Sequence, residues 1–274
     1  MTENKWLSSV FLKQNGIPIP ESKAIFDVGV QLYRDAPKLQ NADDLKSFLT
    51  ECKDYPMFAK PIGGMWSAGA FRITGHTDTH VLVDGSEPVT FAELVDGTLA
   101  KTPYIVQSCL KPHSFFEGIT DATATVRCLN LIHNGTFKGL HTVLKVPQKG
   151  NVADNFWWSG NVLCNLDHET GEIKSIVTSE GGRRIVHDAL PDNARTLLGE
   201  HLPCWSELRA LNEQVALLHA ANRYGSTDIA LTENGPVVIE VNNGCAFELI
   251  QMATGEGLLT GEMTQFFQDC GAKL

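Results

Sequence analysis

The sequence predicts an α+β fold organised as two lobes. Segments typical of strands and of helices follow one another without the regular alternation that builds a parallel sheet. Hairpin signals recur, since Asn134-Gly135 joins two strand-like runs and the turn 169–171 separates two more. The apolar run 104–110 is typical of a buried strand, and we expect the lobes to meet near 103–110.

Helix signals are clearest in three places. Apolar residues at helical spacing follow the N-terminus and stop before Asn15-Gly16, and Asn41 can cap a second helix. The strongest pattern begins after Ser206, which we expect to be the N-cap, and ends before Gly225. The tail 247–267 is expected to be mostly helical.

Composition limits the class of protein. The chain has 274 residues, of which 43% are hydrophobic, so it can bury a substantial core. It shows no run long enough for a membrane span and no secretory signal, and its seven dispersed cysteines are typical of reduced thiols. We therefore expect a cytoplasmic protein. A net charge of −10 argues against nucleic-acid binding.

A magnesium site is predicted by the stretch VVIEVNNG, 237–244. Side chains alternate along strands, so Glu240 and Asn242 share a face, and Asp228 joins them if it pairs opposite Glu240. A three-residue loop centred on Asn234, with Gly235 in the left-handed conformation, would give that pairing. Carboxylate and amide oxygens suit Mg²⁺ when phosphates and water complete its octahedron. The alternative is that these side chains face solvent on a half-exposed sheet.

A phosphate-binding loop is predicted after the strand-like run 57–60. Lys60 ends this run, and Gly63, Gly64 and Ser67 follow it. Glycines let a backbone close on phosphates, and a serine adds a hydroxyl donor. An ordinary hairpin turn is the alternative interpretation.

Taken in order, four stretches resemble the ATP-grasp superfamily. NKWLSSVFLKQNGIPIP resembles its entry helix, FAKPIGGMWSAG its second lysine strand and glycine-rich loop, YIVQSCL its hinge, and DIALTENGPVVIEVNNG its magnesium hairpin. VQSCLKPH, TATVRCLNL and VADNFWWSGNVLCNLDHETGEI are similar to the sugar-transfer-associated subgroup, a relative of α-L-glutamate ligases. The resemblance implies an ATP-grasp fold with the nucleotide between two α+β lobes, 1–108 and 109–274.

The resemblance also implies an activity and its cofactors. Members activate a carboxylate through an acyl phosphate, and an amine or a thiol then attacks, releasing ADP and phosphate. ATP and Mg²⁺, with Mn²⁺ as an alternative cation, would be the cofactors. The metal ligands would be Asp228, Glu240 and Asn242. The nucleotide would contact Lys5, Lys60, Gly63, Gly64, Ser67, Gln107, Ser108, Cys109, Leu110, His113, Leu231 and Ile239.

Arg127 and Lys145 are the expected catalytic residues, because cations stabilise an acyl phosphate and the tetrahedral intermediate. Arg127 and Asn155 are also expected to contact substrate. The alternatives are a surface arginine, an exposed lysine at a strand end and a turn asparagine. His113 has a capping or packing role as its alternative.

The sequence departs from the family pattern in three ways. Only four residues precede Lys5, so the usual N-terminal domain is expected to be absent, and the acceptor would bind the lobes, another subunit of a homodimer, or a carrier protein. Ser226 stands where many relatives have arginine, and Ser108 where many have glutamate.

The expected partners are a small carboxylic acid and an amine, with no nucleic acid or membrane. A small-molecule kinase and a catalytically silent nucleotide-binding protein are the alternative functions.

Overall fold

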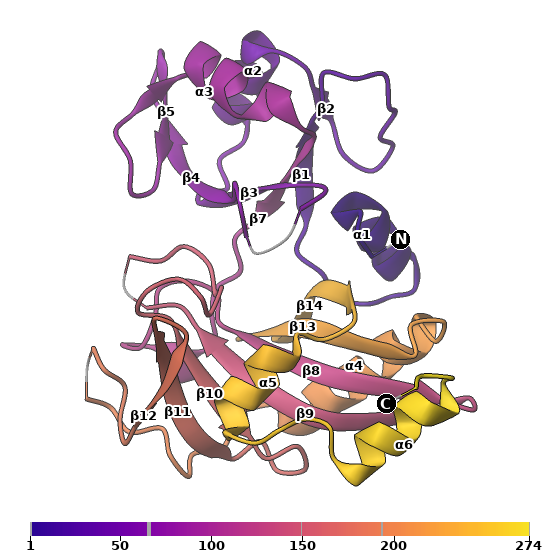
Figure 1. Ribbon diagram of the computed structural model, residues 1–274. Coiled ribbons are helices and arrows are strands. Elements are labelled where there is room, and N and C mark those ends of the chain that lie inside the picture. The colour runs from indigo at the N-terminus through magenta and orange to yellow at the C-terminus, as the bar shows by residue number, and fades with distance from the viewer. Residues whose placement is uncertain (1, 65–66, 149, 193, 274) are drawn as a thin grey trace. The chain divides into compact units, whose positions relative to one another are not determined.

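The structure, a computed structural model, describes residues 2–64, 67–148, 150–192 and 194–273. They form two compact units, Met1–Lys111 and Pro112–Leu274, each built on a seven-stranded sheet with helices (Figure 1). The expected α+β class is therefore confirmed. None of the helices in these ranges is long and apolar enough to cross a lipid bilayer. All seven cysteines are free thiols.

The first unit has the strand order β2-β1-β7-β3-β4-β5-β6. Only the β1–β2 pair is parallel. Its strands are β1 (Ser22–Phe26), β2 (Lys38–Leu39), β3 (Met57–Pro61), β4 (Phe71–His76), β5 (His80–Val83), β6 (Val89–Thr90) and β7 (Tyr104–Ser108). Its helices are α1 (Lys5–Gln14), α2 (Ala42–Glu51), α3 (Phe91–Gly97) and a 3-10 turn at Leu99–Lys101.

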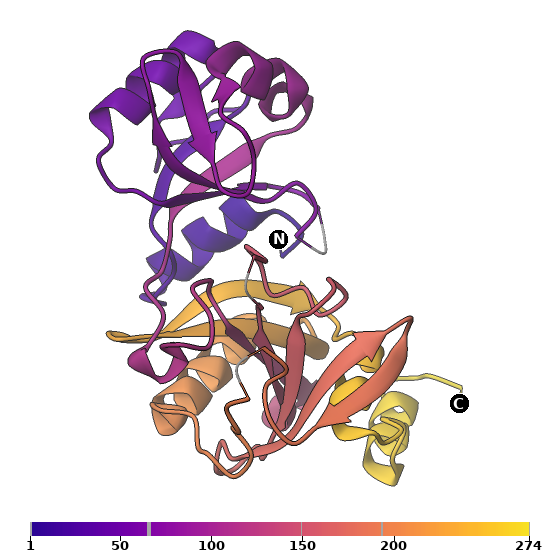
Figure 2. The ribbon, with the colours of Figure 1, turned by 90° about the vertical axis from the view of Figure 1, so that its left-hand side faces the viewer.

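Alternation along β1 and β7 gives the first unit two apolar layers. Phe26 and Val106 face the main core, where α2 and α3 pack on the sheet (Figure 2). Ile25 and Ile105 face the other way and form a smaller cluster with Trp6 of α1. Helix α1 is therefore held by its apolar stripe against the sheet face that α2 and α3 leave uncovered.

The second unit has the strand order β12-β11-β10-β9-β8-β13-β14, with every pair antiparallel. Its strands are β8 (Thr125–His133), β9 (Thr136–Val146), β10 (Val162–Leu166), β11 (Ile173–Glu180), β12 (Arg183–His187), β13 (Tyr224–Thr232) and β14 (Gly235–Asn243). Its helices are α4 (Trp205–Leu218), α5 (Phe247–Thr254), α6 (Gly261–Asp269) and a 3-10 turn at Ser114–Phe116.

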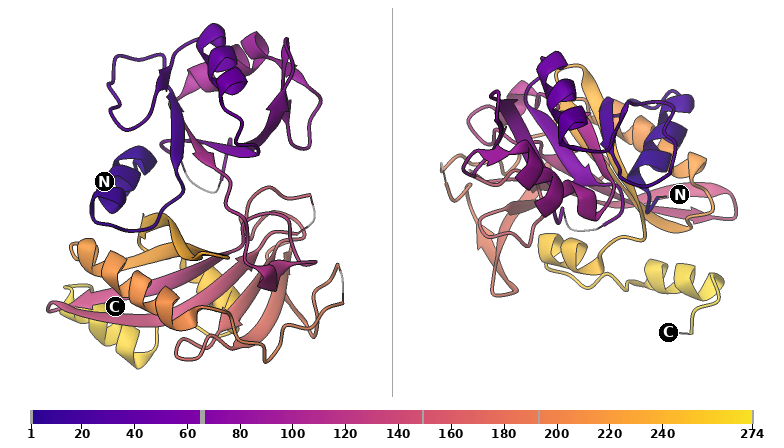
Figure 3. Two further views of the ribbon diagram at one scale, coloured as in Figure 1. Left: turned by 180° about the vertical axis from the view of Figure 1, so that it is seen from behind. Right: turned by 90° about the horizontal axis from the view of Figure 1, so that it is seen from above.

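Helices cover both faces of the second sheet. Helix α4 lies on one face and contacts β13 and β8, whereas α5 and α6 lie on the other (Figure 3). Leu129 and Leu131 of β8 pack with α5 and α6. Because the central strands are buried on both sides, a charged side chain on β8 or β9 needs a partner inside the unit.

Two predicted helix boundaries are wrong. Helix α4 begins at Trp205, with Cys204 and not Ser206 at the N-cap position, and the Ser206 hydroxyl bonds the neighbouring Glu207 instead. The helix ends at Leu218, well before Gly225. Gly225 belongs to β13, where an added Cβ would lie 2.3 Å from the side-chain amide of Asn222, so packing and not helix capping requires glycine there.

Candidate active site

A row of polar side chains crosses the second sheet from β9 to β14. Thr125 of β8 pairs with Lys145 of β9. Two residues further along β8, Arg127 pairs with Asp228 of β13. Asp228 pairs in turn with Glu240 of β14. Residues two apart on a strand share a face, so this register places the row on one side of the sheet. The fold therefore brings together residues from four strands that are far apart in the sequence.

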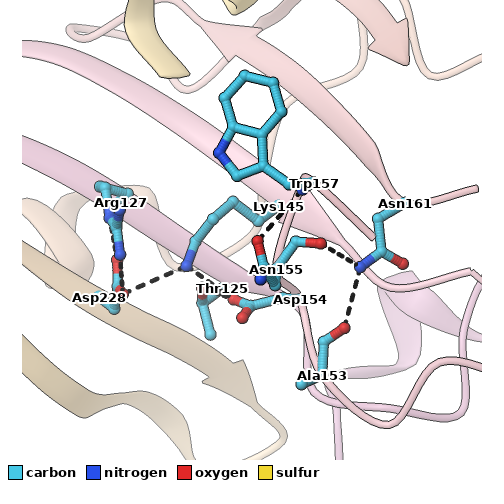
Figure 4. A network of polar contacts seen from close by, with 9 residues as sticks. All are labelled: Thr125, Arg127, Lys145, Ala153, Asp154, Asn155, Trp157, Asn161 and Asp228. Carbon is cyan, nitrogen blue, oxygen red and sulfur yellow. Dashed lines mark hydrogen bonds and ion pairs between the residues drawn. The ribbon is translucent and has the colours of Figure 1, made fainter. Parts of the chain in front are cut away.

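Asp228 and Arg127 form a buried, bidentate ion pair (Figure 4). Arg127 Nε donates to Asp228 Oδ1 at 2.7 Å, and a terminal nitrogen of Arg127 donates to Oδ2 at 2.6 Å. Burial alone would raise the pKa of the Asp228 carboxyl, but Arg127 and Lys145 hold it well below its usual range. Arg127 is thus a mostly buried cation, and its interpretation as a surface arginine is wrong.

Lys145 is shared between two carboxylates. Its Nζ lies 2.9 Å from Asp154 Oδ2 and 3.2 Å from Asp228 Oδ2, and its side chain is only 6% exposed (Figure 4). The Thr125 hydroxyl also donates to Asp154. The alternative of an exposed strand-end lysine is therefore wrong. Two cations and two carboxylates balance each other in this part of the sheet.

Asp154 and Thr125 were missed as site residues by the sequence analysis. Asp154 stands in the ADNFWW segment, whose Asp-Asn pair resembles a family element. Thr125 lies two residues before Arg127, so strand alternation alone places the two on one face. These were the available signals, but neither identifies Lys145 as their partner.

The β13–β14 hairpin has the expected pairing for a different reason. Asp228 pairs with Glu240 and Ser226 with Asn242. The loop, however, has two residues between the paired Thr232 and Gly235, and a bulge beside Asp228 shifts the register so that Ile229 pairs with Val238. The predicted three-residue loop is therefore wrong, although Gly235 does have a positive φ of 102°.

The oxygen donors at this hairpin fit a hard divalent cation. Asp228, Glu240 and Asn242 occupy adjoining register positions, and carboxylate and amide oxygens suit Mg²⁺. Asn242 Nδ2 is buried without a hydrogen-bond partner among the described residues; as a donor, it would pair with an acceptor oxygen and not with the cation itself. The described ranges hold no metal-binding group of three His, Cys, Asp or Glu side chains. A cation here would need ligand oxygens or water as well.

In the first unit, Lys5 lies against the glycine-rich segment. Its Nζ donates to the Gly64 carbonyl at 2.7 Å, and its backbone N–H donates to the Ile62 carbonyl at 3.0 Å. Gly64 has a φ of 121° and Ser67 a φ of 58°. Met65 and Trp66 of this segment lie outside the described residues. The two lysines expected to bind phosphate therefore belong to adjacent parts of the same unit, because Lys60 lies on β3 directly before this segment.

The hinge residues follow β7. Gln107 is buried and its Nε2 reaches the Pro20 carbonyl at 3.5 Å, while the Ser108 N–H donates to the Glu21 carbonyl at 2.9 Å. The Ser108 amide is thus already used within the unit. Burial raises the pKa of the Cys109 thiol to about 11, so it is a poor nucleophile. Leu110 follows and is half-buried.

The other expected site residues lie in varied surroundings. His113 caps the short 3-10 turn, since its Nδ1 accepts from the Phe115 N–H at 3.0 Å, which agrees with the capping alternative. Asn155 Oδ1 accepts from the Trp157 N–H at 3.2 Å. Leu231 is buried in β13, and Ile239 is half-buried at the bulge in β14.

A cavity in the first unit lies away from the expected phosphate residues. It has a volume of about 250 Å³ and lies between α1 and the segment 17–22. Its lining is mainly apolar, with Trp6, Val10 and Ile17 among its walls. Lys5, Lys60 and the glycine-rich segment do not line it, so it adds nothing to a phosphate site.

The two seven-stranded sheets and their helices agree with the fold that the sequence resemblance implies. The model of the sugar-transfer-associated ATP-grasp family matches residues 1–266, and the chain belongs to this family. No curated protein sequence matches the chain significantly.

Solved structures share the fold at low sequence identity. The ADP complex of purK, an N5-carboxyaminoimidazole ribonucleotide synthetase, has a TM-score of 0.51 at 11% identity and covers 100% of this chain. D-alanyl-alanine synthetase A from Vibrio cholerae has a TM-score of 0.51 at 14% identity and covers 98%. This chain spans 52% and 64% of those two proteins. The match establishes the fold.

Proposed function

We propose that this protein is an ATP-dependent ligase that activates a carboxylate as an acyl phosphate and transfers it to an amine or a thiol, releasing ADP and phosphate. The observation that carries the proposal is the buried pair of cations, Arg127 and Lys145, on the same sheet face as Asp228. Phosphoryl transfer depends on positioning and charge neutralisation more than on covalent help from the protein. Membership of the ATP-grasp family supports the same chemistry.

Each residue has a defined task in this proposal. Lys5 and Lys60 bind the α- and β-phosphates, and Gly63, Gly64 and Ser67 close over the phosphate chain. Asp228, Glu240 and Asn242 hold Mg²⁺, which neutralises phosphate charge when bound. Arg127 and Lys145 stabilise the anionic oxygens of the acyl phosphate and of the tetrahedral intermediate. Both cations are preorganised, because their carboxylate partners hold them in place on the sheet before any ligand binds.

The substrates follow from the same chemistry. A small carboxylic acid receives the phosphoryl group, and an amine forms a carbon–nitrogen bond, with a thiol as the other nucleophile. Mn²⁺ can replace Mg²⁺ at an oxygen-donor site. We also propose that the acceptor binds to the two lobes themselves, to a second subunit of a homodimer, or to a carrier protein that presents it.

A thermal-unfolding experiment tests the nucleotide site. A ligand at about 100 times its Kd stabilises a protein by roughly 2.7 kcal/mol, which shifts Tm by about 5–10 °C in a domain of this size. We expect this shift with ATP and Mg²⁺ together, and a much smaller one in Glu240→Gln. Glu262→Gln, which removes a carboxylate from an exposed ion pair with Lys138, is the matched control. A shift that is the same without metal would contradict the proposed site.

An ADP- and phosphate-release assay tests the reaction. We expect phosphate release that requires both a carboxylic acid and an amine or thiol, using a panel of amino and hydroxy acids as acceptors. Lys145→Met should abolish release while the protein remains folded. Phosphorylation of a hydroxyl compound, with no release for any acid–amine pair, would instead identify a kinase.

A further inference from the structure

Asp154 is carried by a loop whose backbone is fixed on both sides of it. Asn161, only 1% exposed, donates from Nδ2 to the Ala153 carbonyl at 3.0 Å and to the Asn155 carbonyl at 2.7 Å (Figure 4). Its Oδ1 accepts from two further groups of the same loop, the Gln148 N–H at 2.9 Å and Asn151 Nδ2 at 2.8 Å. One buried amide therefore uses both its donors and its acceptor to fix the chain around Asp154.

The Asp154 side chain is fixed as well. Its Oδ2 accepts from the Thr125 hydroxyl and lies 2.9 Å from Lys145 Nζ. Asp154 is thus the nearer of the two carboxylates to Lys145, since Asp228 Oδ2 lies at 3.2 Å. A fixed backbone, a hydroxyl donor and a short ion pair make Asp154 the more firmly held partner.

Asp228, by contrast, has little capacity left for a further ligand. A carboxylate offers about four lone-pair sites, and three of them are used by the two contacts to Arg127 and the one to Lys145. The Lys145 contact is the longest of the three. It is also the one whose loss leaves no unpaired charge, because Lys145 keeps Asp154 while Arg127 keeps Asp228.

We propose that Asp154 is a positioning residue that retains Lys145 when Asp228 changes partners. On nucleotide binding, Lys145 releases Asp228 and keeps Asp154. The ammonium group then stays beside the site with a donor turned to the phosphate anion, and Asp228 gains a lone pair for the divalent cation. No covalent bond forms or breaks, and no proton moves. This inference rests on the proposed nucleotide function.

Asp154→Asn tests the inference through metal dependence. An asparagine cannot balance the Lys145 charge, so Lys145 must rely on Asp228 alone and compete with the cation for it. We expect the Mg²⁺ concentration for half-maximal ATP-dependent stabilisation to rise by about tenfold or more, as for the loss of a charge-assisted hydrogen bond. Without metal, the ATP concentration that gives half-maximal stabilisation should differ from the wild-type value by less than about threefold. In the turnover assay, kcat should fall while the KM for ATP stays near the wild-type value.

Thr125 variants provide a second, milder test in case Asp154→Asn does not fold. Thr125→Val keeps the side-chain shape but removes the hydroxyl that holds Asp154. We expect its metal requirement to rise about threefold, which is less than in Asp154→Asn, because Asp154 keeps its charge and its contact with Lys145. Thr125→Ser restores the hydroxyl and should restore the wild-type value. Glu262→Gln again controls for removing a carboxylate from a lysine pair elsewhere in the unit.

The outcomes separate this inference from the function on which it rests. A wild-type metal requirement in Asp154→Asn, or in Thr125→Val if Asp154→Asn does not fold, would overturn the positioning role and leave the proposed function standing. A general loss of ATP binding with an unchanged metal requirement would overturn it too, because that result indicates a structural role. Absence of metal-dependent stabilisation in the wild type would overturn both.

Discussion

Asp228→Asn should destabilise the second unit by about 3–5 kcal/mol in the absence of ligands. The side chains of Asp228, Arg127 and Lys145 are 6%, 16% and 6% exposed, so none of them can exchange its partner for bulk water. Removing one member of a buried ion pair typically costs that much, because the other charge remains buried. Lys145 keeps Asp154, whereas Arg127 loses its bidentate partner, and the new amide can direct an N–H₂ group at a cation.

The measurement is native-state hydrogen exchange on the full chain, followed in peptides from β8 and β13. Hydrogen exchange reports the stability of the second unit separately, whereas a single unfolding curve combines the stabilities of both units. Peptides from β1 and β7 of the first unit should be unchanged and serve as an internal reference. Glu262→Gln, which removes a carboxylate from an exposed pair with Lys138, should cost less than about 1 kcal/mol.

The pH dependence of the same variant follows from the depressed pKa of Asp228. An unfolded aspartate titrates near pH ~3.9, whereas folded Asp228 stays ionised to lower pH. The pair's contribution is therefore complete above about pH 4–5 and declines as pH falls toward the folded pKa. In EDTA, the stability difference between wild type and Asp228→Asn should shrink below about pH 4. A cost under about 1 kcal/mol at pH 7, or a difference that grows in acid, would refute the assignment of a buried, charged pair.

Two further predictions concern local structure. Gly171→Ala should destabilise the protein by about 2–4 kcal/mol, since φ is +73° and an added Cβ would lie 2.6 Å from the Trp205 ring. Gly181→Ala should cost only about 1–2 kcal/mol, because φ is +56° but the space around it is open. Chemical denaturation measures both free energies of unfolding. Ser206→Ala should change the free energy of unfolding by less than about 0.5 kcal/mol, because the Ser206 side chain does not cap α4. Thr90→Ala should cost about 1 kcal/mol, because α3 loses its capping box. An equal effect of the two substitutions would contradict this assignment of the caps.

Local signals in the sequence predicted local structure well. Asn41 accepts from the Asp44 N–H as the N-cap of α2, and Asn134-Gly135 forms the expected hairpin turn with positive φ at both residues. The two-residue strands β2 and β6 were not predicted, because such short segments carry no periodicity. The strand β12 was also missed, since its residues are half-buried or exposed and show no apolar run.

The site was only partly predictable because its contacts join distant segments. The pairing of Asp228 with Glu240 could be inferred within one hairpin, but the bulge that accommodates it leaves no mark in the sequence. Arg127 and Asp228 are 101 residues apart, and only the order of strands in the sheet pairs them. Lys145 looked like an exposed strand end because sequence alone does not show that β9 lies between β8 and β10 in a sheet covered on both faces.

The balance of charge on β8, β9 and β13 gives a physical reason for carboxylates in a site proposed to bind anions. Arg127 and Lys145 would be costly to bury alone, and their charges would repel each other. Asp154 and Asp228 remove that cost and hold both cations on the sheet before a ligand is present. In this arrangement Asp228 occupies the Lys145 donor that a phosphate oxygen would later use. The free protein is then stable with its cations charged, and binding exchanges one anionic partner for another and does not create a charge inside the core.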